Sequence, residues 1–179
     1  MKHITKVFFI SAVALMMAAS CKKDEDKKTD TPSPNAGLTS CSVNGKAWTS
    51  GKTGSYIGVD SFPGCEAYLN GDTMIFISTN FSDTSVVLAQ MVLKPARVGT
   101  YSGTTSTEGG MFYLPKFDEA SLFQAFLMYS TSYNFTISSW DSSKKKLSGT
   151  FSFNMVPNLG GTGFNVTNGK FEDVNYIIE

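Results

Sequence analysis

Histidine is almost absent from this chain. The 179 residues contain a single one, His3, which lies in a segment that we expect to be removed from the mature protein. A mature chain without histidine lacks Ser-His-Asp and Cys-His catalytic groups, histidine metal sites and the commonest general base. We therefore expect a protein that is not an enzyme and that binds neither a metal ion nor a cofactor.

An excess of one sign of charge is also missing. Lysine and arginine number 15, as do aspartate and glutamate. When residues 1–37 are set aside, 9 basic and 11 acidic side chains remain. Nucleic-acid binding needs a strongly basic face, so we expect no nucleic-acid partner. The one basic cluster, Lys144–Lys146, is typical of a solvated hairpin tip.

Long apolar runs are missing as well. The longest one, residues 7–17, is broken only by Ser11 and is shorter than the ~20 residues of a membrane span. Lys2 and Lys6 precede this run, and the small residues 18–20 follow it. This order is typical of a secretory signal peptide, which we assign to residues 1–20.

The tetrapeptide Ala18-Ala19-Ser20-Cys21 resembles the bacterial lipobox, although Leu is commoner at the position of Ala18. The resemblance implies that Cys21 is acylated, for example with palmitate, and becomes the mature N-terminus. Several acyl chains, each contributing ~0.8 kcal/mol per buried CH2, would hold the protein on a membrane. Lys23-Asp24-Glu25-Asp26 resembles the surface-export signal of Bacteroidota lipoproteins; the alternative is a plain solvated linker. We expect an outer-membrane, lipid-anchored and surface-exposed protein.

A composition change divides the rest of the chain. Residues 21–37 contain no large apolar side chain after the cysteine, which predicts a disordered tether. Residues 38–179 are long enough to bury one core, so we expect a single, monomeric domain there.

The periodicity of this domain is that of β-strands. Short runs rich in β-branched and aromatic residues alternate with polar positions, at Tyr56–Val59, Thr73–Ser78, Val86–Leu93, Tyr133–Ser138 and Thr150–Met155. Turn signals separate them, at Asn44-Gly45, Asn70–Asp72, Lys94-Pro95, Asp141–Ser143 and Asn168-Gly169. The pattern predicts an all-β fold, an antiparallel β-sandwich or a partly open β-barrel. Asp118–Met128 suits a helix or a buried strand.

Two cysteines remain in the domain, Cys41 and Cys65. Outside the cytoplasm they can form a disulfide, which would close a loop of about 25 residues and contribute on the order of 3 kcal/mol. The alternative is two separate buried thiols.

Three segments of the domain resemble uncharacterised Bacteroidota lipoproteins with a β-rich domain. In that family an N-G-K-x-W opening, an I-S-G-T-F-S-F strand and a closing V-x-I-T-N-G-x-F segment recur. The matching segments here are Ser42–Trp48, Lys146–Phe153 and Asn165–Phe171. The resemblance implies a β fold and a location in the cell envelope, and it supplies no catalytic residue.

Candidate contact residues are few. Trp48 and Trp140, with Tyr101 and Tyr113, are the aromatic side chains to consider for contact with a glycan or protein ligand, but core packing is the expected role of each. Asp72-Thr73-Met74 resembles the O-glycosylation motif of Bacteroidota, with Thr73 as acceptor.

These residues favour a binding or structural module at the cell surface. One alternative is a small barrel that carries an apolar ligand among its methionines and phenylalanines. The other is a glycan hydrolase that uses two carboxylates drawn from Asp60, Glu66, Asp118 and Glu119.

The anchor is directly testable. Cys21→Ser removes the thiol that the acyl chains would modify, so we expect the variant to lose acylation. Mass spectrometry of the mature N-terminus measures this, and an unmodified cysteine in the wild-type protein would contradict the assignment.

Overall fold

Strands account for about three quarters of the chain that the computed structural model describes, which is residues 38–51, 53–56, 59–105, 109–116, 128–157 and 162–178. All of these residues belong to one unit, Pro34–Glu179. The all-β fold is confirmed, and the main sheet is nearly closed into a barrel. The strands are β1 Leu38–Val43, β2 Lys46–Thr49, β3 Thr53–Tyr56, β4 Val59–Pro63, β5 Cys65–Asn70, β6 Thr73–Asn80, β7 Ser85–Val92, β8 Gly99–Gly103, β9 Gly109–Leu114, β10 Met128–Asp141, β11 Lys146–Pro157 and β12 Phe164–Ile178.

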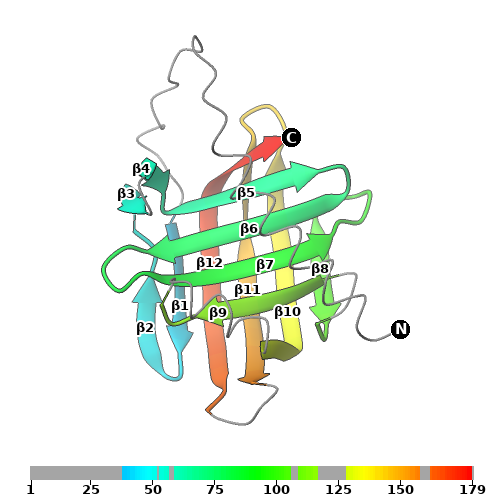
Figure 1. The fold of residues 1–179 in the computed structure, drawn as a ribbon. Coiled ribbons are helices and arrows are strands. Elements are labelled where there is room, and N and C mark those ends of the chain that lie inside the picture. Colours follow the sequence, from blue (N-terminus) through cyan, green and yellow to red (C-terminus); the bar gives the residue numbers. More distant parts are fainter. Residues whose placement is uncertain are drawn as a thin grey trace. The chain divides into compact units, whose positions relative to one another are not determined.

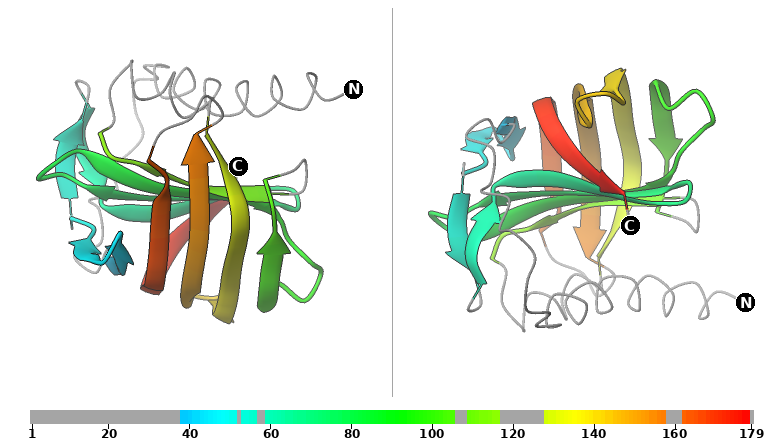
Figure 2. Two further views of the ribbon diagram at one scale, coloured as in Figure 1. Left: turned by 90° about the horizontal axis from the view of Figure 1, so that it is seen from below. Right: turned by 90° about the horizontal axis from the view of Figure 1, so that it is seen from above.

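The main sheet folds over itself into two layers. One layer is β5–β6–β7–β9, and its strands run across β12, β11, β10 and β8 of the other layer (Figure 1). The strands of the second layer lie side by side in the same order in both views of Figure 2. β1 pairs with β12 and β2, while β3 and β4 form a separate hairpin. The layers are joined where the end of β12 pairs in parallel with β5.

β12 passes from one layer to the other through two bulges. Its first half pairs with both β1 and β11, and Asn175–Ile178 then pair with β5. The register shifts at Asn168 and at Asp173, whose φ angles are positive, 54° and 50°. Bulges bend a strand and increase its twist, which redirects β12 toward β5. The backbone N–H of Asp173 donates to the Ser148 hydroxyl at 2.9 Å.

The expected turn at Asn168-Gly169 is therefore wrong, because both residues lie inside β12. Asn tolerates the left-handed conformation that both a tight turn and this bulge require, so the dipeptide does not distinguish them. The strand expected at Tyr56–Val59 is also wrong. Tyr56 ends β3, Val59 begins β4, and the two residues pair with each other.

The other expected strands lie within β6, β10 and β11, and Val86–Leu93 corresponds to β7 but runs one residue past its end at Val92. Asn44-Gly45 forms the β1–β2 turn, with φ angles of 49° and 81°. Lys144 and Lys145 lie exposed in the turn between β10 and β11, which confirms the hairpin tip. The segment Asp118–Met128 lies outside the described residues except for Met128, the first residue of β10.

Four phenylalanine rings join the layers. Phe76 of β6 lies 5.6 Å from Phe135 of β10 and 5.1 Å from Phe171 of β12, measured between ring centroids. Phe135 stacks on Phe171 at 4.9 Å, and Phe151 of β11 lies 6.4 Å from each of the other three rings. All four are buried. Their burial and mutual contacts make this cluster the centre of the described core.

Two of these rings lie on glycines of the neighbouring strand. In the β11–β12 ladder, Phe151 is opposite Gly169, and Gly149 is opposite Phe171. A Cβ atom at Gly169 would overlap the Phe151 ring, and one at Gly149 would overlap both the Phe171 ring and the Thr136 carbonyl. The two strands each carry a Gly-x-Phe triplet, Gly149–Phe151 in β11 and Gly169–Phe171 in β12. The glycine of each triplet leaves space for the phenylalanine ring of the other triplet to lie flat on the backbone.

The gap in the barrel lies along β9, where contacts through side chains of β10 and β11 replace a strand ladder. The Met111 N–H donates to the Ser130 hydroxyl at 3.4 Å, and the Tyr113 N–H donates to Met155 Sδ at 3.5 Å. Thr105 fixes Ser130 by accepting its N–H at 2.8 Å and by a hydroxyl contact of 2.7 Å. We refer to these contacts as the β9–β10 seam.

The glycine–phenylalanine packing predicts a specific stability loss. Gly149→Ala forces a Cβ atom against the Thr136 backbone, so we expect the free energy of unfolding in urea to fall by about 3 kcal/mol. Gly103→Ala is the matched control, because its Cβ atom would meet nothing closer than the Tyr133 hydroxyl at 3.5 Å. We expect the control to change stability by no more than about 0.5 kcal/mol. Equal effects of the two substitutions would contradict the packing argument.

Candidate functional site

Trp140 lies at the end of β10, where the chain reaches one rim of the barrel. Its side chain is half-buried. The Tyr176 ring of β12 packs against it with a centroid distance of 4.5 Å, and the Arg97 guanidinium carbon lies 5.6 Å from the ring centre. An arginine over a tryptophan ring is a favourable cation–π contact, so Arg97 and Trp140 hold each other in place.

The loop between β7 and β8 positions Arg97. Arg97 has a φ angle of 60°, and its N–H donates to the Lys94 carbonyl at 2.9 Å. The buried Tyr101 hydroxyl donates to the Arg97 carbonyl at 2.9 Å and accepts the Lys94 N–H at 3.2 Å. Tyr101 is therefore a support for this loop and not a surface contact residue.

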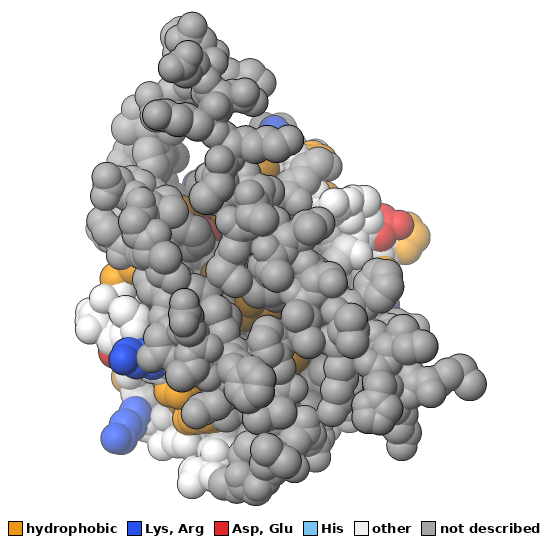
Figure 3. All heavy atoms as spheres, in the orientation of Figure 1, with side chains coloured by type: hydrophobic (Ala, Val, Ile, Leu, Met, Phe, Trp, Pro, Cys, Tyr) orange, Lys and Arg blue, Asp and Glu red, His pale blue; other side chains and the backbone are white. Residues whose placement is uncertain are grey.

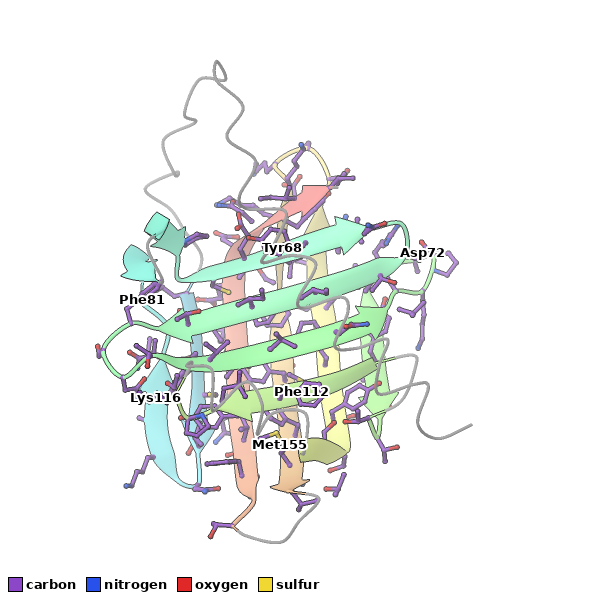
Figure 4. The ribbon with its side chains drawn as sticks, viewed as in Figure 1. Tyr68, Asp72, Phe81, Phe112, Lys116 and Met155 are labelled. Carbon is purple, nitrogen blue, oxygen red and sulfur yellow. The ribbon has the colours of Figure 1, made fainter. Side chains whose placement is uncertain are left out.

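Arg97 also meets an exposed carboxylate. Its Nη2 lies 3.4 Å from Asp72 Oδ1, and the Asp72 side chain is 73% exposed at the hairpin between β5 and β6 (Figure 4). Arg97 Nη1 is buried and has no hydrogen-bond partner. A pair of this length, with one partner largely exposed, stabilises the fold little.

Exposed apolar side chains gather on the same strand ends. Of the five large hydrophobic residues that are most exposed in the described chain, four lie on these segments. Val92 pairs with the residue after Asp72, Val98 follows Arg97, and Ile177 and Ile178 follow Tyr176. On the face shown in Figure 3, acidic and hydrophobic side chains adjoin at the right-hand rim. We call Asp72, Arg97 and Trp140 the Trp140 patch.

Trp48 occupies a different environment. It is 5% exposed, and its indole N–H donates to the Ser85 hydroxyl at 2.6 Å. Ser85 in turn donates to Asp83 at 2.5 Å. Tyr113 is also buried and meets the Phe164 ring edge-on, with a centroid distance of 5.1 Å. The structure thus places Trp48 and Tyr113 in the core, where a ligand has no access to their rings.

The two domain cysteines are free thiols. Cys41 and Cys65 are both buried, and Cys65 Sγ lies 3.0 Å from the Thr39 hydroxyl. Of the two alternatives, separate buried thiols are the one seen here, and the disulfide is not formed. Burial raises the pKa of each thiol to about 12.

The remaining candidates are dispersed. Thr73 is partly exposed at the start of β6, directly after Asp72, and its modification stays a prediction. Glu66 is half-buried on β5; burial raises the pKa of its carboxyl, and the Tyr68 hydroxyl donates to it at 2.7 Å. Asp118, Glu119 and the Asp60 side chain lie outside the described residues, as does Cys21. Within the described ranges, no group of three or more histidine, cysteine or acidic side chains is arranged to hold a metal ion.

Comparison of the chain with models of protein families, with curated proteins and with solved structures finds no match. In the part of the chain that is described, no helix is long and apolar enough to span a membrane.

The sequence offered Trp140 as a possible contact residue, with a core role expected, and indicated none of the groups around it. Arg97 and Asp72 are 25 residues apart, and neither belongs to a motif that indicates contact with an aromatic ring. The only local signal was the turn composition around each of them.

The buried thiols predict a loss of stability at high pH. The unfolded chain releases its thiol protons near pH 9, whereas the folded chain keeps them until about pH 12, so unfolding becomes easier as the pH rises through this window. Between pH 8 and pH 10 we expect each thiol to lower the free energy of unfolding by up to about 1.4 kcal/mol.

Urea unfolding under reducing conditions at both pH values measures this effect. The comparison is a double variant, Cys41→Ala with Cys65→Ala, which shares every other titrating group. An identical pH dependence of the two proteins would contradict the prediction.

Proposed function

We propose that this protein is a lipid-anchored lipoprotein of the cell envelope, whose β domain is a binding or structural module at the cell surface. The observation that carries the proposal is Cys21, directly after an apolar run and the small residues 18–20. The charged, Pro- and Ser-containing tether that follows would set the domain away from the membrane. The partly exposed Trp140 patch supports a binding role over a purely structural one.

A carrier of apolar ligands has less support. That alternative needs methionines and phenylalanines around a cavity, but Met74, Met91, Met111 and Met155 are each at most 1% exposed. The phenylalanine cluster lies between the layers with its rings in mutual contact. These side chains fill the described core, as in small barrels whose interiors are solid.

A carboxylate-dependent hydrolase also has less support. Such an enzyme places two carboxyl groups across a cleft, one of them with a raised pKa. Of the four candidates, Glu66 is the one whose side chain is described; burial raises the pKa of its carboxyl, and the Tyr68 hydroxyl donates to it.

Surface display can be tested through the tether. Replacement of residues 23–26 with alanine removes the charge pattern next to the cysteine, and we expect acylation to persist while protease shaving of intact cells releases less protein. The matched control replaces residues 27–30, which lie on the same tether but farther from Cys21. Equal shaving of the wild type and the 23–26 variant, with both acylated, would reduce residues 23–26 to a plain linker.

A further inference from the structure

We infer that one end of the barrel docks on an anionic membrane surface. The inference rests on the proposed anchoring of the chain at Cys21, and it names the part of the domain that faces the lipid. We call this part the tether end, and it consists of the exposed side chains of Leu38, Val98, Lys144, Lys145, Ile177 and Ile178.

Strand directions place these side chains at the same end of one layer. Leu38, the first residue of β1, pairs with Glu172 near the end of β12. Lys146, the first residue of β11, pairs with Asn175. β8 also begins here, because its first residue, Gly99, pairs with the second half of β10. In Figure 1 the β10–β11 turn lies next to the C-terminus. The chain therefore enters the domain at the end where this turn and the last residues of β12 are exposed.

The tether end is also the end nearest to the anchor along the chain. Seventeen peptide bonds separate Cys21 from Leu38. A chain of this length reaches at most about 60 Å, and a flexible one averages about 20–25 Å between its ends. An acylated Cys21 would thus keep Leu38 within reach of the lipid headgroups. Docking is then an intramolecular event, which needs little affinity of its own.

The apolar side chains fit the boundary between headgroups and acyl chains. Of the five large hydrophobic side chains that are most exposed in the described residues, four belong to the tether end, and Ile178 is the most exposed, at 59%. Such a concentration of exposed aliphatic groups marks an interaction surface. The half-buried Trp140 contacts Arg97 and Tyr176, which directly precede two of these side chains. Tryptophan is enriched where proteins meet the membrane–water interface.

Positive charge is concentrated at the same end. The end segments 94–99, 141–146 and 172–178 carry five basic and three acidic side chains, a net charge of +2. Residues 38–179 as a whole carry 9 basic and 11 acidic side chains, so the rest of the domain has a net charge of −4. An anionic headgroup layer attracts the tether end and repels the remainder. The charge distribution therefore favours one orientation of the domain.

The lysines of the β10–β11 turn are held in place through the backbone. The Asp141 carboxylate accepts the N–H groups of Ser143 at 3.0 Å and of Lys144 at 2.9 Å, and the Lys145 carbonyl accepts the Tyr176 N–H at 3.0 Å. The Lys144 side chain is 74% exposed, with Nζ 3.6 Å from Asp141 Oδ2. Each such ammonium group near an anionic surface strengthens binding about fivefold.

Quenching of tryptophan fluorescence by brominated lipids tests the inference on the full acylated chain. The protein is reconstituted in vesicles with bromine on the acyl chains, made of phosphatidylglycerol with phosphatidylethanolamine or of phosphatidylcholine alone. Bromine quenches only at short range, so emission falls only if the domain lies on the bilayer. We expect quenching in the anionic vesicles, which added salt reduces. Absence of quenching, or equal quenching in the two kinds of vesicle, would overturn the inference.

Two tryptophan variants identify the end that meets the lipid. We expect Trp140→Phe to abolish the quenching and Trp48→Phe to retain it, because Trp140 lies at the tether end whereas Trp48 is buried in the core. Quenching that survives Trp140→Phe would overturn the orientation.

Charge reversals identify the surface independently. We expect Lys145→Glu to lower the ratio of docked to undocked domain on the order of tenfold. Lys46→Glu is the matched control, because Lys46 is also exposed and lies in the hairpin at the opposite end of β1. Ile178→Ser, at a largely exposed side chain, should lower the same ratio several-fold. Equal effects of the two charge reversals would overturn the assignment of the surface.

Mass spectrometry of the same reconstituted sample reports the state of Cys21. An acylated chain without quenching would overturn the docking and leave the anchor in place. A chain without acylation would contradict the proposed anchor, and the docking that rests on it. Failure of the inference and failure of the proposed function are thus distinguishable.

Discussion

The packing of phenylalanine rings on glycine backbone, across β11 and β12, is the contact on which the rest of the structure depends. Phe151 and Phe171 lie flat only because Gly169 and Gly149 have no side chains. Their flat orientation brings Phe135 and Phe76 into ring contact and so connects the two layers. The Ser-Gly-Thr-Phe-Ser-Phe and Thr-Asn-Gly-Lys-Phe segments, which carry the family resemblance, therefore have a clear role in the fold.

The same pairing determines where the candidate site lies. With Gly149 opposite Phe171, the next register shift falls at Asp173, whose N–H is taken up by Ser148. Beyond this bulge, the Tyr176 N–H donates to the Lys145 carbonyl at 3.0 Å, and the Tyr176 ring packs under Trp140. The support for the exposed indole thus follows from the register of a ladder in the centre of the core.

Local patterns in the sequence were sufficient for much of the fold. Alternation of apolar and polar residues identified β6, β7, β10 and β11, because each has one face toward the core. It did not reveal that β12 runs through Asn168-Gly169, because a bulge and a turn make the same demand on the backbone. The parallel pairing of β12 with β5 has no local signal, since it joins segments about a hundred residues apart.

The candidate site was less predictable than the fold. An aromatic side chain at a strand end suggested Trp140, but its neighbours Arg97 and Tyr176 reach it only through tertiary structure. Trp48, like Trp140, is flanked in the sequence by small and polar residues. It is nevertheless buried, because the hairpin at Asn44-Gly45 turns it toward Ser85. Exposure of a side chain depends on the whole sheet and cannot be obtained from neighbouring residues alone.

The contacts of the β9–β10 seam protect an edge strand of the sheet from pairing with another copy of the protein. An edge strand with free N–H groups is a template on which another chain can add a strand, and this is a common route to aggregation. At the seam, the N–H groups of Met111 and Tyr113 are directed to Ser130 and Met155 of the same chain. β9 is thereby protected from strand addition by another chain, even when many copies of the protein are close together.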